Sequence, residues 1–326
     1  MGLPGKSLSI VAVLCVVAVF IWQSRYTPTT KSLNVQENLH PPVTRVLSDA
    51  SATSTTPLVP AARAFDLRAQ FRKSQNYAAL VREFSAQATA GDPTAEYLTA
   101  RALKYCSDTI RLHFRNPEGL AKTRNEVEVR VGKYPIGLQQ EILEAYDRCH
   151  EFLADSSQSN SMLVWESWLN KSSAAGYPPA ESLKADLLLQ ADLMQDAASA
   201  SAGDIVPPTH GPARDLALRA VLSGNPDSIF EMMNWVDGTK HSMDESADLL
   251  GAWQLLACQR GYDDCGPTSD WLRSMCNWDP QCANDSSVTD NLMRRFGSRF
   301  DDVQNLANSI GLAIDQKDQQ AVESYL

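Results

Sequence analysis

The stretch "SAAGYPPAESL", residues 173–183, has the form of a tight turn between two helices. Gly176 suits the left-handed conformation at a helix end, and Pro178 suits the first turn of the next helix, where its missing N–H costs no hydrogen bond. The same order of small residue, glycine and proline recurs in "ATAGDPTAEYL", residues 88–98, and in "AVLSGNPDSIF", residues 220–230. The sequence therefore predicts helices joined by glycine–proline turns.

Apolar residues between these turns recur at helical spacing. In "GLQQEILEAYDRCHEFL", residues 137–153, and in "SADLLGAWQLLAC", residues 246–258, an apolar side chain returns every three or four positions, which places it on one helix face. Residues 126–131, "EVEVRV", alternate with a period of two, so a short strand is the alternative there, although Val127 and Val131 also fit a helix face. We therefore expect an all-α fold.

The spacing of the turns indicates a repeat. Gly91, Gly176 and Gly224 lie 85 and 48 residues apart, which is about two units and one unit of a period in the forties. The pattern resembles tetratricopeptide-type repeats of the Sel-one-like class, and this resemblance implies a helical-hairpin array in which helix pairs stack into a solenoid. Because the Trp, Gly and Tyr markers of a strict tetratricopeptide unit are not in register, an irregular helical bundle with the same turns is the alternative.

The N-terminus predicts a membrane anchor. Residues 1–25 contain an apolar run from Leu8 to Trp22 that is flanked by Lys6 and Arg25, and one helix of this kind can cross a thin bilayer. The end of the run is bulky, whereas a cleaved signal peptide needs small residues at its cleavage site. We therefore expect an uncleaved signal anchor that forms one transmembrane helix, with a cleaved signal peptide and a buried helix as the alternatives.

The rest of the chain divides into a tether and a folded body. Residues 26–62 are rich in Thr, Ser and Pro and lack periodicity, so they predict a disordered tether, and residues 63–326 form the predicted α-helical domain. Four of its stretches are "RALKYC", "AYDRC", "AAGYPPA" and "WQLLACQRG". In these the chain resembles uncharacterised helical envelope proteins of Gram-negative bacteria, which implies no particular activity. We expect a single-pass protein of the bacterial inner membrane with its C-terminal domain in the periplasm.

Six cysteines of the body predict disulfide bonds. They are Cys106, Cys149, Cys258, Cys265, Cys276 and Cys282. An even number of cysteines beyond a membrane-targeting segment is typical of a disulfide framework in an oxidising compartment. Cys106 and Cys149 each end an apolar helix face, so a bridge between them would tie two neighbouring helices together.

The four cysteines within residues 258–282 have more than one interpretation. Proximity favours Cys258 with Cys265 and Cys276 with Cys282, each across a turn. The intervening segments hold six, ten and five residues, whereas structural zinc takes ligand pairs two to four residues apart, so a four-thiolate zinc site is disfavoured. Redox catalysis is disfavoured too, because a Cys-x-x-Cys motif is missing. Free thiols in a reducing compartment are the remaining alternative.

Composition and motifs argue against several functions. A net charge of −10 is unlike the clustered Lys and Arg of a nucleic-acid-binding protein. The sequence lacks HExxH, a P-loop, G-x-S-x-G and G-x-G-x-x-G, so we expect no cofactor, no metal and no catalytic residue. The histidines of the body are scattered, and we assign no role to them; they are His113, His150, His210 and His241.

Acidic pairs and tryptophans have a structural and a functional interpretation. Asp263 with Asp264 fits the start of a helix, where carboxylates stabilise the positive end of the helix dipole, and acid catalysis is the alternative. The tryptophans of the body lie mostly on helix faces, so core packing is expected, and a groove for a sugar or peptide is the alternative.

These features favour a binding scaffold that is not an enzyme. We expect a membrane-anchored periplasmic protein of helical repeats that binds a protein or peptide partner and no nucleic acid. A cell-envelope hydrolase with an acidic catalytic residue and a purely structural envelope protein are the alternatives. An enzyme should concentrate carboxylates or a histidine with shifted pKa values in a deep pocket, whereas a scaffold should present a broad groove.

Overall fold

The chain is described by a computed structural model in several stretches of the body. They are residues 61–114, 122–134, 136–154, 164–199, 211–236, 241–267, 269, 271–272, 276, 281–282 and 285–326. All of them belong to one compact unit, Thr56–Leu326. The predicted signal anchor, residues 1–25, lies outside the described residues, as does the predicted tether, residues 26–62, apart from its last two positions. Across the described stretches, no helix has both the length and the apolar character that a membrane crossing requires.

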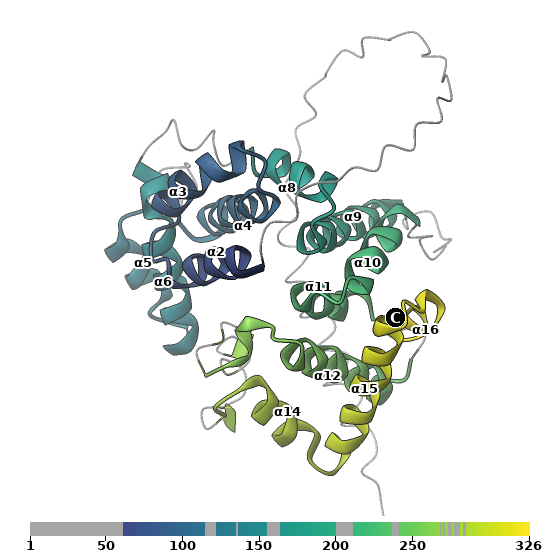
Figure 1. Ribbon diagram of the computed structural model, residues 1–326. Coiled ribbons are helices and arrows are strands. Elements are labelled where there is room, and N and C mark those ends of the chain that lie inside the picture. The colour runs from purple at the N-terminus through teal and green to yellow at the C-terminus, as the bar shows by residue number, and fades with distance from the viewer. Residues whose placement is uncertain are drawn as a thin grey trace, which may run out of the picture. The chain divides into compact units, whose positions relative to one another are not determined.

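Every regular element among the described residues is a helix (Figure 1), which confirms the predicted all-α class. In chain order the α-helices are α2 (Ala61–Lys73), α3 (Tyr77–Thr89), α4 (Pro93–Thr109), α5 (Arg124–Val131), α6 (Ile136–Ala154), α8 (Trp165–Ala174), α9 (Pro178–Ser199), α10 (Gly211–Leu222), α11 (Pro226–Glu231), α12 (Met243–Gln259), α14 (Val288–Phe296), α15 (Phe300–Asp315) and α16 (Gln319–Glu323). Short helical turns of other types are η1 (Ile110–Phe114), η4 (Met232–Trp235), η5 (Asp263–Cys265) and η7 (Gly297–Arg299).

The "EVEVRV" segment lies in helix α5, so the alternative of a strand is wrong. Thr123 and Glu126 form a capping box: the Thr123 hydroxyl accepts the Glu126 backbone N–H at 3.3 Å, and the Glu126 carboxylate accepts the Thr123 backbone N–H at 2.6 Å. Val127 and Val131 are buried on one face, four residues apart. The local cap and the packing of this face together override the period of two.

The predicted glycine–proline turns follow helices α3, α8 and α10. Gly91, Gly176 and Gly224 have φ angles of 85°, 74° and 77°, which are left-handed. Gly261 after α12 and Lys317 after α15 have φ angles of 86° and 57° and make turns of the same kind. At four of the five turns, the residue that follows donates its backbone N–H to the carbonyl five residues earlier, at 2.8 to 3.2 Å. The same turn therefore recurs five times among the described residues, and the sequence pattern predicts three of these five turns.

Helices that are close in sequence pack against one another in space (Figure 1). Helix α3 contacts α4, α4 contacts α8, α8 contacts α9 and α9 contacts α10; further on, α11 contacts α12 and α12 contacts α15. Helices α5 and α6 contact each other, and α6 also contacts α3 and α4. Two hydrophobic clusters fill the interior. One includes Phe84, Leu103 and Phe152, and the other includes Trp253 and Leu292.

The structure brings the six predicted cysteines together in three pairs, in the predicted combination. The Cα–Cα distances are 5.4 Å for Cys106–Cys149, 5.6 Å for Cys258–Cys265 and 5.0 Å for Cys276–Cys282. The first bridge joins helix α4 to helix α6 within the first hydrophobic cluster, where both cysteines are fully buried. The other two close short loops.

Candidate functional site

Charged and aromatic side chains from five parts of the fold converge where helices α2, α4 and α11 meet the turns after α8 and α12. We call this group the arginine–tyrosine cluster. Its members are Arg68, Arg72, Tyr97, Arg101, Tyr177, Asp227, Glu231, Tyr262 and Asp263.

The repeated turn places two of the tyrosines. Tyr177 directly follows Gly176, and Tyr262 directly follows Gly261, so both phenols leave the chain at the same position of an equivalent turn. Helix periodicity places two other pairs. Tyr97 and Arg101 are four residues apart on α4, and so are Asp227 and Glu231 on α11, which puts each pair on one helix face.

Two arginines of α2 have carboxylate partners from distant parts of the chain. Arg68 forms an ion pair with Asp227, with 2.7 Å between Nη2 and Oδ2, and its Nη2 also donates to the Tyr177 hydroxyl at 3.0 Å. The Arg68 and Asp227 side chains are only 17% and 12% exposed, so solvent screens this pair less than a surface pair. Arg72 forms an ion pair with Asp263, so that this acidic residue contacts an arginine in addition to starting a helical turn.

Arg101 has a different environment. Its Nη1 donates to the Tyr97 hydroxyl over a long 3.4 Å, and its guanidinium carbon lies 5.8 Å from the centre of the Phe71 ring, a cation–π distance. Among the residues that the structure describes, no carboxylate forms an ion pair with Arg101. A guanidinium carries five N–H donors, so the described residues leave most of its donor capacity unused.

The electrostatics of the cluster keep Arg101 charged and the tyrosines neutral. The Arg101 pKa is raised well above its ordinary value by the Tyr97 oxygen first and, in spite of burial, by Tyr262, Glu231 and Asp227. Burial raises the pKa of Tyr97 and of Tyr262, so both remain neutral phenols at neutral pH. The cluster therefore offers a permanent cation beside hydroxyl groups that can donate.

Glu231 is the perturbed acid of the cluster. Burial raises its pKa to about 7, with Asp186 and Asp227 adding to the effect and Arg101 opposing it. Asp186, on α9, has its own pKa raised by burial while Lys104 opposes that shift. Near neutral pH, Glu231 is therefore divided between a carboxylate and a neutral acid that can donate a hydrogen bond.

Aromatic rings border the charged groups. Tyr262 stacks on Phe230 with 4.3 Å between ring centres, and Trp271 meets the edge of Phe230 at 6.4 Å. Tyr97 and Tyr177 lie 5.5 Å apart. Of the tryptophans, Trp271 thus lies next to the cluster, whereas Trp253 is fully buried in the core, as expected for most of them.

One of the three cysteine bridges lies next to the site without being part of it. The Cys258–Cys265 bridge closes the turn that carries Tyr262 and Asp263, so it restricts the position of both side chains. None of the cluster residues except Asp263 was singled out by sequence reasoning. The available signal was the Gly-Tyr dipeptide, which occurs after both helix α8 and helix α12.

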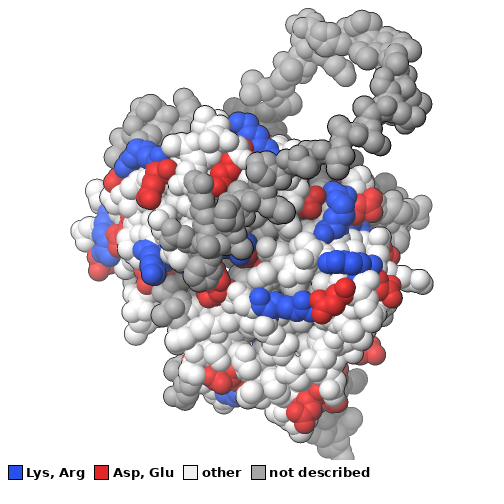
Figure 2. All heavy atoms as spheres, in the orientation of Figure 1, with Lys and Arg blue, Asp and Glu red and all other residues white. Residues whose placement is uncertain are grey.

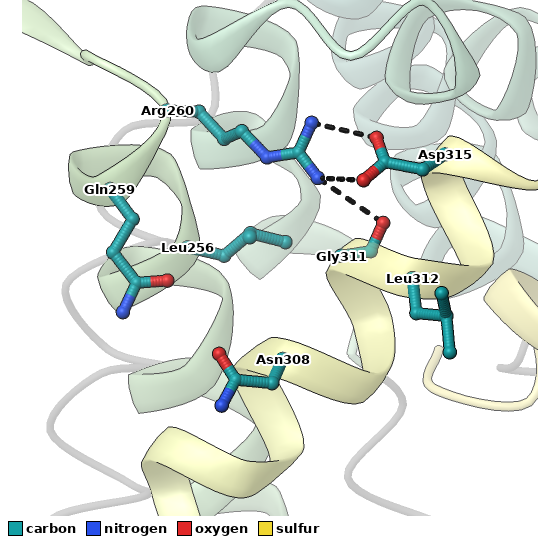
Figure 3. Close-up of a pocket in the computed structure, with 7 residues that line it drawn as sticks. All are labelled: Leu256, Gln259, Arg260, Asn308, Gly311, Leu312 and Asp315. Atoms are coloured by element: carbon teal, nitrogen blue, oxygen red, sulfur yellow. Dashed lines mark hydrogen bonds and ion pairs between the residues drawn. The ribbon is translucent and has the colours of Figure 1, made fainter.

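A second arginine provides a contrast with Arg101. Arg260 lines a hollow between α12 and α15 with Gln259 and Asn308 nearby (Figure 3). Its guanidinium donates to both oxygens of Asp315 at 2.8 Å and to the Gly311 carbonyl at 3.2 Å. Because the Arg260 guanidinium is already paired with the Asp315 carboxylate, this hollow has little capacity for an anionic ligand.

Metal-binding groups are not found where the structure allows a search. In the described stretches, no group of three or more His, Cys, Asp or Glu side chains is placed to hold a metal ion. His113 has its pKa lowered by burial, and His210 lies outside the described residues. On the face drawn in Figure 2, basic and acidic side chains lie interspersed.

Comparisons with protein-family models, with curated proteins and with solved structures found no match to this chain. Among the described residues, the arginine–tyrosine cluster brings together a charged arginine, buried tyrosines and an acid with a raised pKa, which makes it the candidate site.

Proposed function

We propose that the protein is a non-enzymatic scaffold that binds a protein or peptide partner, and that the partner contacts the arginine–tyrosine cluster. One observation carries this proposal: Arg101 lies against the Phe71 ring and makes one long side-chain hydrogen bond, to the Tyr97 hydroxyl, with no ion pair to a described carboxylate. A partly buried guanidinium with unused donors is costly unless water or a ligand satisfies it. Arginine and tyrosine are also the residues most enriched at the centres of protein interfaces.

The helical repeat supports a scaffold. The five equivalent turns and the contacts between consecutive helices favour a solenoid-like array of helical hairpins over an irregular bundle. In such arrays, equivalent turns come to one edge, and the stacked helices present an extended binding surface. Tyr177 and Tyr262 would then reach a ligand from two different repeats, with the Gly224 turn between them in the sequence, which is how a repeat protein builds one site from several units.

We further propose that a single N-terminal helix anchors the chain in the bacterial inner membrane and that the body lies in the periplasm. Three cysteine pairs at bonding distance support an oxidising compartment, because disulfides persist there and are rare in the cytosol. The apolar run of residues 8–22 is the basis for the anchor.

Photo-crosslinking in living cells tests the scaffold. A photoreactive amino acid replaces Asn234, which is exposed and donates to Glu231 at 3.2 Å, and in a control strain it replaces Val129, which is 77% exposed on α5. We expect a discrete adduct with another protein from position 234 and none from position 129. The adduct should disappear when Arg101 is changed to Gln. Equal adducts from both positions, or an adduct yield that Arg101→Gln does not change, would contradict a partner at the cluster. The absence of any adduct would favour a purely structural role.

A hydrolase is the second candidate, because one observation favours it. Glu231, with a pKa of about 7, has the protonation behaviour of a general acid at neutral pH, and Asp227 lies one helical turn away. Release of soluble fragments from isolated cell walls measures this activity. The hydrolase requires release by the unmodified protein and its loss on Glu231→Gln, whereas the scaffold predicts no release by either.

A further inference from the structure

We infer that Arg101, together with the hydroxyl groups of Tyr97 and Tyr262, forms a receptor for one carboxylate group of the bound partner. This inference rests on the proposed function and adds to it the chemical group that the cluster recognises.

The three arginines of the cluster differ in their hydrogen-bond partners. Of the arginines that meet in the cluster, Arg68 and Arg72 each have a carboxylate partner, whereas the described residues give Arg101 one side-chain hydrogen bond, to the Tyr97 hydroxyl, and a cation–π contact with the Phe71 ring. The planar guanidinium fork matches a carboxylate, which can accept two parallel N–H bonds from it. Tyr97 accepts from Arg101 and keeps its own O–H free to donate to the same anion.

The positive charge of Arg101 is balanced less completely than that of Arg68 or Arg72. Asp227 neutralises Arg68, and Asp263 neutralises Arg72, so Glu231 remains to balance Arg101, and its effect on the Arg101 pKa is larger than that of Asp227. Burial keeps Glu231 partly protonated near neutral pH, so the positive charge of Arg101 is not fully cancelled. A protonated Glu231 can also donate its O–H to a bound anion.

The acids around Arg101 favour a carboxylate ligand over a more highly charged one. The remaining acids that face Glu231 are Asp227 on its own helix and Asp186 on α9, and Asp264 faces Arg72 and Tyr262 from η5. These acids would repel a doubly charged phosphate. One uncompensated cation among several acids matches a single negative charge, which is the charge of a peptide C-terminus or of one Asp or Glu side chain.

Calorimetric titration of the full chain with N-acetylglycine tests the receptor, with neutral N-acetylglycinamide as the control probe. We expect the acid to bind and the amide not to bind. Arg101→Lys keeps the charge but loses the fork, and we expect it to weaken binding by about tenfold or more. Arg260→Lys is the matched control, because Arg260 is already paired with Asp315, and it should leave binding unchanged. Circular dichroism checks that both variants are folded.

The pH dependence gives a second readout. Binding of N-acetylglycine should be tighter at about pH 6, where Glu231 is mostly protonated, than at about pH 8, and Glu231→Gln should remove the difference. Absence of binding to the unmodified chain, or equal binding by the unmodified chain and Arg101→Lys, would overturn the receptor.

Three peptides of one sequence distinguish the source of the carboxylate and separate this inference from the scaffold. One has a free C-terminus, one is amidated, and one is amidated with an internal Asp. Arg101-dependent binding of the first or third identifies the source. If all three peptides bind, and bind equally to the unmodified chain and to Arg101→Lys, the receptor would be overturned while the scaffold proposal would remain. Conversely, N-acetylglycine binding at Arg101 with no crosslinked partner would support the receptor and count against the scaffold.

Discussion

Removing the Cys106–Cys149 bridge should cost the protein a large part of its stability. The two cysteines are 43 residues apart in sequence, and cross-linking them restricts the unfolded chain. The chain-entropy relation gives about 4 kcal/mol for a loop of this length, against about 2.4 kcal/mol for the seven-residue separation of Cys258 and Cys265. Both Cys106 and Cys149 are fully buried, so replacing them by alanine also removes packed sulfur from the core.

The assay is guanidinium unfolding of the full chain without reductant. The double variant Cys106→Ala with Cys149→Ala should lose about 4 kcal/mol or slightly more in free energy of unfolding, and the double variant at Cys258 and Cys265 should lose roughly half as much. Reductant should destabilise the unmodified chain, and it should destabilise the first variant less. A loss of under about 1 kcal/mol for the first variant, or no effect of reductant on the unmodified chain, would mean that Cys106 and Cys149 are free thiols in the folded protein and would contradict a stabilising bridge.

Three other substitutions test the packing, the electrostatics and a helix cap. Gly251→Ala places a Cβ 2.6 Å from the Phe296 ring, so it should destabilise the protein by about 1 to 3 kcal/mol in chemical unfolding. The raised pKa of Glu231, about 7 against an ordinary 4.5, means that the folded protein holds a proton which the unfolded chain releases. Stability should therefore fall by at most about 3 kcal/mol as the pH rises from about 4.5 to 7, and Glu231→Gln should remove that contribution from a pH series of unfolding curves. Thr123→Ala removes the cap of α5 and should cost about 0.5 to 2 kcal/mol, with faster amide hydrogen exchange in that helix.

Each of these variants has a control and an opposing result. Gly211→Ala meets nothing within 4 Å, so an equal loss there would mean that the contact with Phe296 is not the cause. Glu83→Gln on the exposed face of α3 should keep the pH dependence that Glu231→Gln loses, and a pH series that Glu231→Gln leaves unchanged would contradict burial as the source of the shift. For Thr123→Ala, unchanged exchange rates in α5 would show that the capping box contributes nothing.

The features that the sequence predicts well are local ones. Gly91, Gly176 and Gly224 could be recognised as turns because glycine and the following proline act within a few residues. The pairing of Cys258 with Cys265 follows from proximity in the same way. The turn at Lys317 could not be predicted, because a lysine in the left-handed conformation carries none of the usual signals.

The candidate site, in contrast, depends on contacts between residues that are far apart in the sequence. Arg68 meets Asp227, and Arg72 meets Asp263, across more than 150 positions of the chain. A single sequence does not record such contacts, since arginines and acids at these positions fit an ordinary solvated helix face equally well. The environment of Arg101 is also invisible to pattern reading, because it depends on rings and acids that only the folded chain brings together. Asp263, assigned to a helix start, contacts an arginine for the same reason.

If a partner is held through Arg101, its affinity must differ between two arginine variants. Once crosslinking has identified the partner, its dissociation constant is measured for the unmodified full chain, for Arg101→Gln and for Arg260→Gln. We expect a loss of affinity of about tenfold or more for Arg101→Gln and no appreciable loss for Arg260→Gln. Equal affinity of the unmodified chain and Arg101→Gln would contradict a partner held through Arg101.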